Sequence, residues 1–226
     1  MNTTIWNAGY LTLMFLALFG IAEWLYHKRH WAAETTRKIV HIGTGLLSLL
    51  FPVMLANHWL VLILCSAFLL ILLLSLHYKL LPSINAIDRK SAGSLAFPVA
   101  VYGCYLVYNW QQQQYIYYYL PILILGLCDP AAAFVGRRLP KGKFSVRADA
   151  KTLSGSGAFF VVAFLLSVAL SIFASAQSAV APVMVTALLV ALLSSIAEAL
   201  SGKGYDNLTI PAAVLAALAM SNELYL

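Results

Sequence analysis

Three acidic side chains, Glu23, Asp129 and Glu198, stand inside or at the ends of long apolar runs. An ionisable group inside a bilayer costs roughly 2.5 kcal/mol or more, so it is a functional candidate by default. Asp206 follows Glu198 closely, and carboxylate oxygens suit Mg²⁺, which is usually held by one or two carboxylates plus substrate phosphates. We therefore predict Asp129 and Asp206, with Glu198, as metal ligands. The alternative is that Asp129 pairs with a basic residue for structure alone.

Asp129 has two further features in its own segment. Pro130 follows it and has no backbone N–H, so a carbonyl one turn earlier is freed for other uses. Arg137 lies eight residues further on, about 12 Å along a helix. Asp129 and Glu198 are therefore the carboxylates that we expect to take part in catalysis, and Glu23, closer to the interface, receives no role.

A basic loop follows Asp129 and ends on Lys151-Thr152-Leu153-Ser154-Gly155-Ser156. The end of this loop offers a cation, hydroxyls and a glycine at the start of an apolar run, and helix N-termini present free N–H groups to anions. Basic loops also bind anionic lipid without any specific site. We predict that the loop binds a phosphate-bearing ligand through Arg137, Arg138, Lys143, Lys151, Thr152, Gly155 and Ser156.

Two shorter basic elements come earlier in the chain. Arg37 and His41 are four residues apart and share a helix face, with Lys38 beside them. Arg89 and Lys90 open the second element, which leads into an apolar run. We predict that the four cations bind a lipid headgroup or phosphate, and that His41 or an acid positions a reacting hydroxyl. The candidate motifs thus occupy residues 37–41, 88–94, 129–156 and 198–211.

The elements that must position these residues are membrane helices. The 226-residue chain is 62% hydrophobic and 10% charged, whereas soluble domains carry about 25% charged residues. We expect one integral membrane domain, residues 1–226, folded as an all-α bundle. Runs of about 17 to 25 apolar residues can span a bilayer, and eight are predicted: Tyr10–Tyr26, Ile39–Ala56, Trp59–His77, Ala92–Trp110, Ile116–Val135, Leu153–Phe173, Ala181–Leu200 and Leu208–Leu224.

The basic residues support this count. With eight spans, all fourteen Lys and Arg residues fall in the loops after spans 1, 3, 5 and 7, and the loops on the other side contain none. Because cytoplasmic loops carry an excess of Lys and Arg, we expect both termini outside and every candidate motif on the cytoplasmic side.

The motifs together resemble the polyprenol kinase family. The resemblance rests on Arg37-Lys38-x-x-His41, the Asp129–Arg138 stretch, Lys143-Phe144, Lys151-Thr152-x-x-Gly155-Ser156 and Asp206-Asn207-Leu208-Thr209-Ile210-Pro211, in this order. That family includes phytol kinases and dolichol kinases, is related to CTP-dependent diacylglycerol kinases and is distantly similar to phosphatidate cytidylyltransferases. Many phytol and dolichol kinases have an acid where this chain has Ser154, which affects the choice of acceptor.

The resemblance implies a lipid kinase that transfers a phosphoryl group from CTP to a long-chain alcohol such as a prenol, a polyprenol or diacylglycerol, with Mg²⁺ as cofactor. The expected partners are therefore a nucleoside triphosphate and a membrane lipid alcohol, and no nucleic acid; the oligomeric state stays open. A cytidylyltransferase that makes a CDP-lipid needs the same metal and triphosphate sites and is the alternative. A lipid or anion transporter is a further one, although transporter sites tend to lie near the bilayer midplane.

Overall fold

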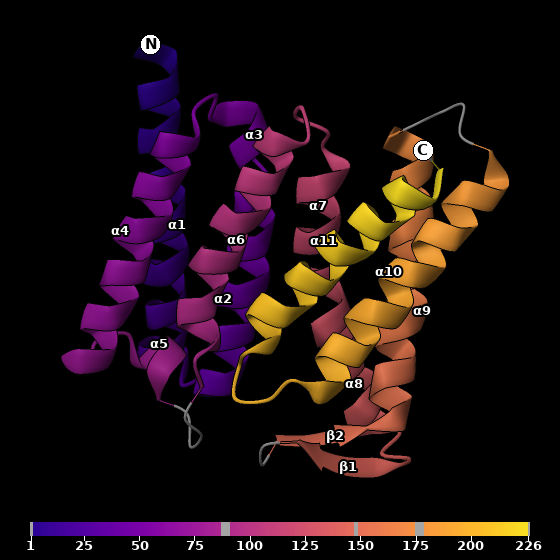
Figure 1. Ribbon diagram of the computed structural model, residues 1–226. Coiled ribbons are helices and arrows are strands. Elements are labelled where there is room, and N and C mark those ends of the chain that lie inside the picture. The colour runs from indigo at the N-terminus through magenta and orange to yellow at the C-terminus, as the bar shows by residue number, and fades with distance from the viewer. Residues whose placement is uncertain (1, 87–90, 147–148, 175–178, 226) are drawn as a thin grey trace.

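The computed structural model describes residues 2–86, 91–146, 149–174 and 179–225. Long helices run side by side through the molecule, with short connections at both ends (Figure 1). In chain order the elements are α1 Asn2–Arg29, α2 Ala33–Ser48, α3 Phe51–Met54, α4 His58–His77, α5 Pro82–Asn85, α6 Gly93–Trp110, α7 Ile116–Leu123, a π-helical turn Ile124–Cys128, α8 Asp129–Arg138, β1 Lys143–Val146, β2 Asp149–Thr152, α9 Leu153–Ala174, α10 Val180–Leu200 and α11 Asp206–Tyr225.

Six helical segments of the described chain are long and apolar enough to cross a membrane. They are Thr3–Arg29, Ala33–Met54, His58–His77, Ile116–Arg138, Leu153–Ala174 and Val180–Leu200. Each overlaps one predicted span, so the prediction of a helical membrane bundle is confirmed. The other two predicted spans fold as α6 and α11, helices of 18 and 20 residues that lie outside this set of six. A total of eight spans therefore stays a prediction.

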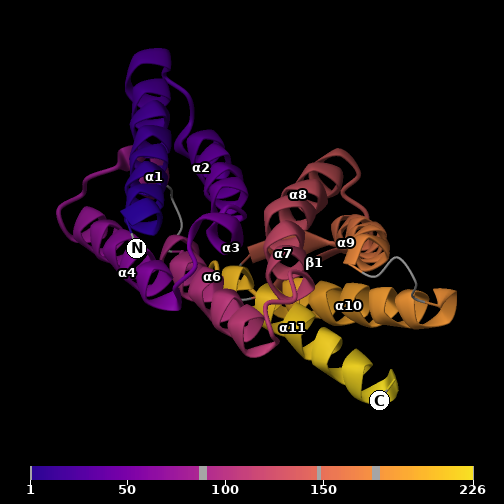
Figure 2. The ribbon, with the colours of Figure 1, turned by 90° about the horizontal axis from the view of Figure 1, so that it is seen from above.

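The helices form two packed groups around a shared central segment (Figure 2). One buried core is built mainly from α1, α2, α4 and α6, and the other from α9, α10 and α11. The segment α7–α8 contributes to both, since Tyr118 and Ile122 pack into the first core while Leu120 and Ile124 pack into the second. Lipid tails are as apolar as these side chains, so close van der Waals packing is what holds such helices together.

A short β-hairpin interrupts the helical architecture, and the sequence reasoning did not predict it. β1 and β2 pair antiparallel, with Lys143 opposite Thr152 and Val146 opposite Asp149. The sequence signal is weak, because Lys143–Val146 alternates polar and apolar residues over only four positions and Asp149–Thr152 shows no such alternation. The hairpin lies below the ends of α8 and α9, at one end of the bundle (Figure 1).

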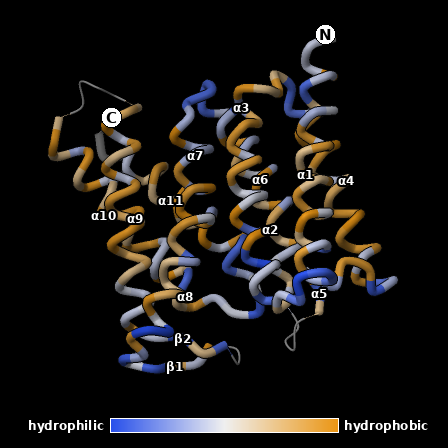
Figure 3. The backbone as a smooth tube through the Cα atoms, turned by 180° about the vertical axis from the view of Figure 1, so that it is seen from behind, coloured by the Kyte–Doolittle hydropathy of each residue, from blue (hydrophilic) through white to orange (hydrophobic). Residues whose placement is uncertain are grey.

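The two ends of the chain lie away from the hairpin (Figure 1). Hydrophilic residues gather around the hairpin and in the connections at both ends of the bundle, while the helices between them are mostly hydrophobic (Figure 3). This arrangement agrees with termini on one side and the long basic loop on the other. Which side faces the cytoplasm stays a prediction.

Candidate active site

The helix that carries Asp129 widens into a π turn immediately before it. In a π turn a carbonyl pairs with the N–H five residues later, so Leu125 would need the N–H of residue 130, and residue 130 is Pro. The ring of His41 approaches this carbonyl instead, with Nε2 3.5 Å from the Leu125 oxygen. A carbonyl only accepts, so the contact requires the proton on Nε2. Pro130 therefore frees a carbonyl, as predicted, and His41 uses it.

His41 is also held from a second side. Its ring meets the edge of Phe97 on α6, with 5.7 Å between centroids. His41, which belongs to α2, therefore lies between the π turn and α6. Single-turn π bulges inside α-helices are frequent at functional sites, and here the bulge places Asp129 and His41 in the same part of the molecule.

Charged groups from four distant stretches of the chain interact electrostatically around Asp129. Asp129 interacts with Asp206, Glu198, Lys151 and Lys38. His41 interacts with Asp206 and Arg37. Three of the four candidate motifs, residues 37–41, 129–156 and 198–211, therefore meet at one place.

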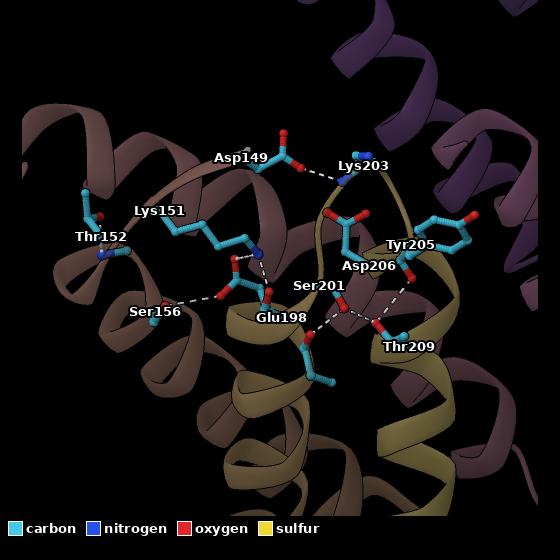
Figure 4. Close-up of polar contacts among 12 residues, drawn as sticks. Asp149, Lys151, Thr152, Ser156, Glu198, Ser201, Lys203, Tyr205, Asp206 and Thr209 are labelled. Carbon is cyan, nitrogen blue, oxygen red and sulfur yellow. Dashed lines mark hydrogen bonds and ion pairs between the residues drawn. The ribbon is translucent and has the colours of Figure 1, made fainter. Parts of the chain in front are cut away.

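Glu198 is the most completely bonded of these carboxylates. Its Oε1 accepts from Lys151 Nζ at 2.7 Å and its Oε2 accepts from Ser156 Oγ at 3.2 Å. Lys151 also donates to the backbone carbonyl of Glu198. The side chains are 12% and 8% exposed, which makes this a buried ion pair between the hairpin and the end of α10 (Figure 4). Lys151 therefore lines the site and at the same time forms an ion pair with Glu198.

The turn between α10 and α11 is fixed against the hairpin and α6. Asp149 accepts from the Lys203 backbone N–H at 2.5 Å (Figure 4). Asn207 donates to the Gly93 carbonyl at 2.7 Å. Gly204, with φ +84°, leaves its Cα so close to Gly93 that an added Cβ would overlap the Gly93 backbone. This close crossing brings Asp206 to the site.

The start of α9 differs from what we predicted. Thr152 caps the helix, since its Oγ1 accepts from Gly155 N at 3.0 Å. The amide of Leu153 donates to the Gly142 carbonyl at 3.0 Å, and that of Ser154 to the Lys141 carbonyl at 3.5 Å. The first-turn N–H groups thus already have protein acceptors. The N–H groups of Leu153, Ser154 and Gly155 are therefore already bonded, so a phosphate site here would rest on side chains.

A single cavity of about 780 Å³ joins the charged cluster to an apolar region. Its polar end is lined by charged and hydroxyl side chains from α2, α8, the hairpin, α9 and the α10–α11 turn. Its apolar arm runs between α1, α2, α4 and α6. The lining residues of the arm are Phe15, Phe19, Val40, Thr44, Ser48, Phe51, Cys65, Phe68, Leu72, Ile84 and Val101. Pockets for small ligands commonly measure 300–1,000 Å³ and combine apolar walls with a few placed polar groups.

Comparison with known proteins identifies the family. The chain is 30% identical over 212 residues to a phytol kinase of Synechocystis sp., covering 93% of this chain and 90% of the relative. The chain belongs to the phytol kinase family. No protein-family model and no solved structure matches it.

In this member of the phytol kinase family, twelve of the predicted site residues line the cavity: Arg37, Lys38, His41, Asp129, Arg137, Lys143, Lys151, Thr152, Gly155, Ser156, Glu198 and Asp206. Arg138 is placed elsewhere. Its guanidinium lies over the Phe134 ring at 4.6 Å from the centroid, and it is absent from the described lining. Phosphate binding by Arg138 stays a prediction. Arg89 and Lys90 lie outside the described residues.

Sequence reasoning missed several residues that line the cavity. Glu34, Asp149 and Asn207 are polar members, and the apolar arm was not predicted at all. Asp149 is an acid in an otherwise basic loop, and Asn207 follows Asp206, so both had a local signal. The apolar arm had no sequence signal. The residues that line it come from helices far apart in the sequence, and each looks like an ordinary residue of a membrane span.

The donor set fits a divalent cation held jointly with a phosphate ligand. Asp129 and Asp206 interact with each other and line the same cavity. Among the described residues, no three His, Cys, Asp or Glu side chains gather closely enough to hold an ion by themselves. Mg²⁺ usually keeps several waters and binds one or two carboxylates plus substrate phosphates, so two carboxylates that line one cavity with several cations would be sufficient.

Proposed function

We propose that the protein is a membrane lipid kinase that transfers a phosphoryl group from CTP, or another nucleoside triphosphate, to a long-chain lipid alcohol. The observation that carries the proposal is the single cavity with a charged end and an apolar arm. A lipid alcohol has a reacting hydroxyl and a hydrocarbon tail, and a triphosphate needs cations, so one continuous cavity offers a place for each part. The membership of the phytol kinase family supports the same reaction class.

The polar end would hold the triphosphate through side chains. Arg37, Lys38, Arg137 and Lys143 line it, and they come from α2, α8 and β1. Arg binds phosphate oxygens through bidentate, charge-assisted hydrogen bonds, which fix orientation as well as adding affinity. In phosphoryl transfer the protein contributes mainly positioning and electrostatic stabilisation. Cations that converge from separate elements can contact several phosphate oxygens at once.

Asp129 and Asp206 are the residues that would hold Mg²⁺. The ion would neutralise charge on the transferring group and the phosphates beside it. Glu198, which the sequence also suggested as a ligand, has both carboxylate oxygens bonded to Lys151 and Ser156. We therefore assign Glu198 chiefly to positioning Lys151 and the hairpin against the site.

The acceptor hydroxyl would lie near His41, where the charged end meets the apolar arm. His41 and Thr44 both line the cavity and lie one turn apart on α2. The tail would extend from there between α1, α4 and α6. With its Nε2 proton directed to the Leu125 carbonyl, His41 keeps Nδ1 as an acceptor for the hydroxyl proton.

The reaction products test the proposal. The purified protein, in lipid nanodiscs with Mg²⁺ and a lipid alcohol, is incubated with CTP and separately with ATP, GTP and UTP. We expect a lipid monophosphate and a nucleoside diphosphate, with CTP as the best donor, and no product when EDTA replaces Mg²⁺. Release of pyrophosphate from CTP with phosphatidate as acceptor would instead identify a cytidylyltransferase. Failure to consume any nucleotide with any lipid would exclude both enzymes.

A further inference from the structure

The apolar arm of the cavity is enclosed by protein. Phe15, Phe51, Phe68, Leu72 and Val101 line it, and each is at most 8% exposed. Side chains on the lipid-facing surface are far more exposed, as Leu70 at 56% on the same helix as Phe68 illustrates. A tail that enters the arm from the charged end therefore passes into the bundle and has to end inside it.

Aromatic side chains line the far end, and two tyrosine hydroxyls hold the backbone around it. The Phe15 and Phe51 rings lie 5.9 Å apart, and Phe51 is 2% exposed. Tyr118 donates to the Ser48 carbonyl at 2.7 Å, and Tyr105 donates to the Leu55 carbonyl at 2.5 Å. Both tyrosines are buried, so these bonds hold the end of α2 and the α3 turn firmly in place.

The helix geometry gives the length of the arm. His41 and Ser48 both line the cavity, and seven residues of helix separate them, about 10 Å at 1.5 Å per residue. Arg37 and Ser48 are eleven residues apart, about 16 Å on the same count. An extended hydrocarbon advances about 1.3 Å per carbon, so the arm takes roughly 8 to 13 carbons when straight and more when bent.

We propose that this closed arm is a length gauge for the acceptor, with Phe51 as its end stop. The inference rests on the proposed function, which puts the alcohol tail in the arm. By the same geometry, the arm takes a single chain of roughly 8 to 13 carbons when straight and more when bent. Two-tailed diacylglycerol and polyprenols several times longer do not fit an arm that ends at Phe51.

The test compares substitutions that lengthen and shorten the arm. Phe51→Ala removes the end stop, while Ser48→Leu adds volume in the arm; the Ser48 hydroxyl bonds only to Gly45 of its own helix among the described contacts. Phe159→Ala is the control, because Phe159 is fully buried in the other core and absent from the described lining. Phe51→Leu replaces Phe51→Ala if the alanine variant does not fold.

Two readouts use linear alcohols of increasing chain length at equal mole fraction in nanodiscs. The first is thermal stabilisation without nucleotide, and the second is kcat/KM for phosphoryl transfer. The wild-type protein and Phe159→Ala should share one optimum length. Phe51→Ala should move it to longer chains by about four carbons, the depth of one ring. Ser48→Leu should move it to shorter chains and lower kcat/KM for the former optimum at least tenfold, since one methylene in an apolar pocket is worth about that factor.

The two readouts separate failure of the gauge from failure of the proposed function. Transfer to alcohols of every length at equal kcat/KM, or optima that do not move in either substituted protein, would overturn the gauge and leave the kinase standing. A length-dependent stabilisation that moves with Phe51 and Ser48, without transfer from any nucleotide, would keep the gauge and overturn the kinase.

Discussion

At the scale of single residues, Asp129 is placed by its own neighbours in the chain. Pro130 cannot donate to Leu125, the helix widens into a π turn, and His41 approaches the freed carbonyl. The carboxylate then interacts with Asp206, Glu198, Lys151 and Lys38. A group in this position, with two other carboxylates near it, is suited to share a cation.

Asp129→Asn should abolish phosphoryl transfer and leave the folded protein intact. The amide keeps the size of the carboxylate and removes the charge that a divalent cation requires. Turnover of the radiolabelled triphosphate measures the loss, and thermal unfolding in nanodiscs measures the fold. Near-normal turnover at ordinary Mg²⁺ would mean that Asp129 is not a ligand and that its interactions are structural.

Arg137 and Arg138 are adjacent but differ in environment, which makes them a matched pair. Arg137 lines the cavity, whereas Arg138 lies over Phe134. Arg137→Ala should raise the KM for nucleotide about ten- to a hundredfold, because losing a hydrogen bond to a charged group costs about 1.5 to 3 kcal/mol. Arg138→Ala should change it less than threefold. Steady-state kinetics at saturating lipid measure the KM for nucleotide of both variants. An equal effect of the two substitutions would place the triphosphate outside the cavity.

Some residues of the site can be predicted from the sequence and others cannot, depending on the residue type and its neighbours. An acid in an apolar run and a dense group of cations can be recognised in the sequence, and eight predicted acids and cations line the cavity. Arg138 is absent from the described lining of the cavity, because charge and spacing do not tell which way a side chain points. The free N–H groups expected at the start of α9 are also bonded at Leu153, Ser154 and Gly155, since Thr152 and the 141–142 turn supply acceptors that only the folded loop brings close.

At the scale of elements, a crossing of two glycines fixes α8 against α9 and thereby places the hairpin. A Cβ on Gly136 would lie 3.6 Å from the Gly155 Cα and 2.6 Å from Thr152 Oγ1, the cap of α9. Small residues at helix crossings let backbones approach closely in membranes. Gly155 therefore serves the packing of the helices, where the sequence alone suggested a phosphate contact.

Gly136→Ala should destabilise the protein, and Gly157→Ala provides the control. The added methyl must displace the Thr152 side chain, and overpacking of this kind costs about 1 to 3 kcal/mol, or roughly 4–8 °C in Tm for a middle value. A Cβ on Gly157 meets nothing within 4 Å and improves helix propensity by up to about 1 kcal/mol. Thermal unfolding in nanodiscs measures both. Equal Tm values would show that the crossing tolerates a methyl group.

The helices were predictable because their signal is simple. Each predicted span coincides with a helix, since about twenty consecutive apolar residues leave few other folds in a membrane. The hairpin was not predictable from the sequence. Its eight paired residues have mixed polarity, and contacts with residues far away in the sequence hold them in place. Asp149 bonds to the Lys203 amide and Lys151 to Glu198, both across more than forty residues of sequence.

At the scale of the whole molecule, the site is built where the two helical groups meet. The apolar arm belongs to the group of α1, α2, α4 and α6, while the charged end takes residues from α8, the hairpin and the α10–α11 turn. Neither group contains a complete site. A lipid alcohol held by the first group and a triphosphate held by cations of both groups would meet near His41 and Asp129.

This arrangement requires the hairpin and the site to face the compartment that holds the nucleotide. The hairpin lies at the opposite end of the bundle from the N-terminus (Figure 1), and its loop contains the densest group of cations in the chain. Because such loops stay in the cytoplasm, Lys141 should be cytoplasmic and the loop at Gln112 should be on the other side. Both residues are exposed, so a label can reach them.

Single cysteines introduced at Gln112 and at Lys141 test this orientation in intact cells. The native Cys65, Cys104 and Cys128 are buried, so they should react slowly with an impermeant maleimide and leave a low background. Gln112→Cys should be labelled in intact cells, and Lys141→Cys only after the membrane is opened. The unsubstituted protein measures the background in both conditions. Labelling of both positions from the same side would contradict the eight-span arrangement and would separate the basic loop from the site that it is proposed to serve.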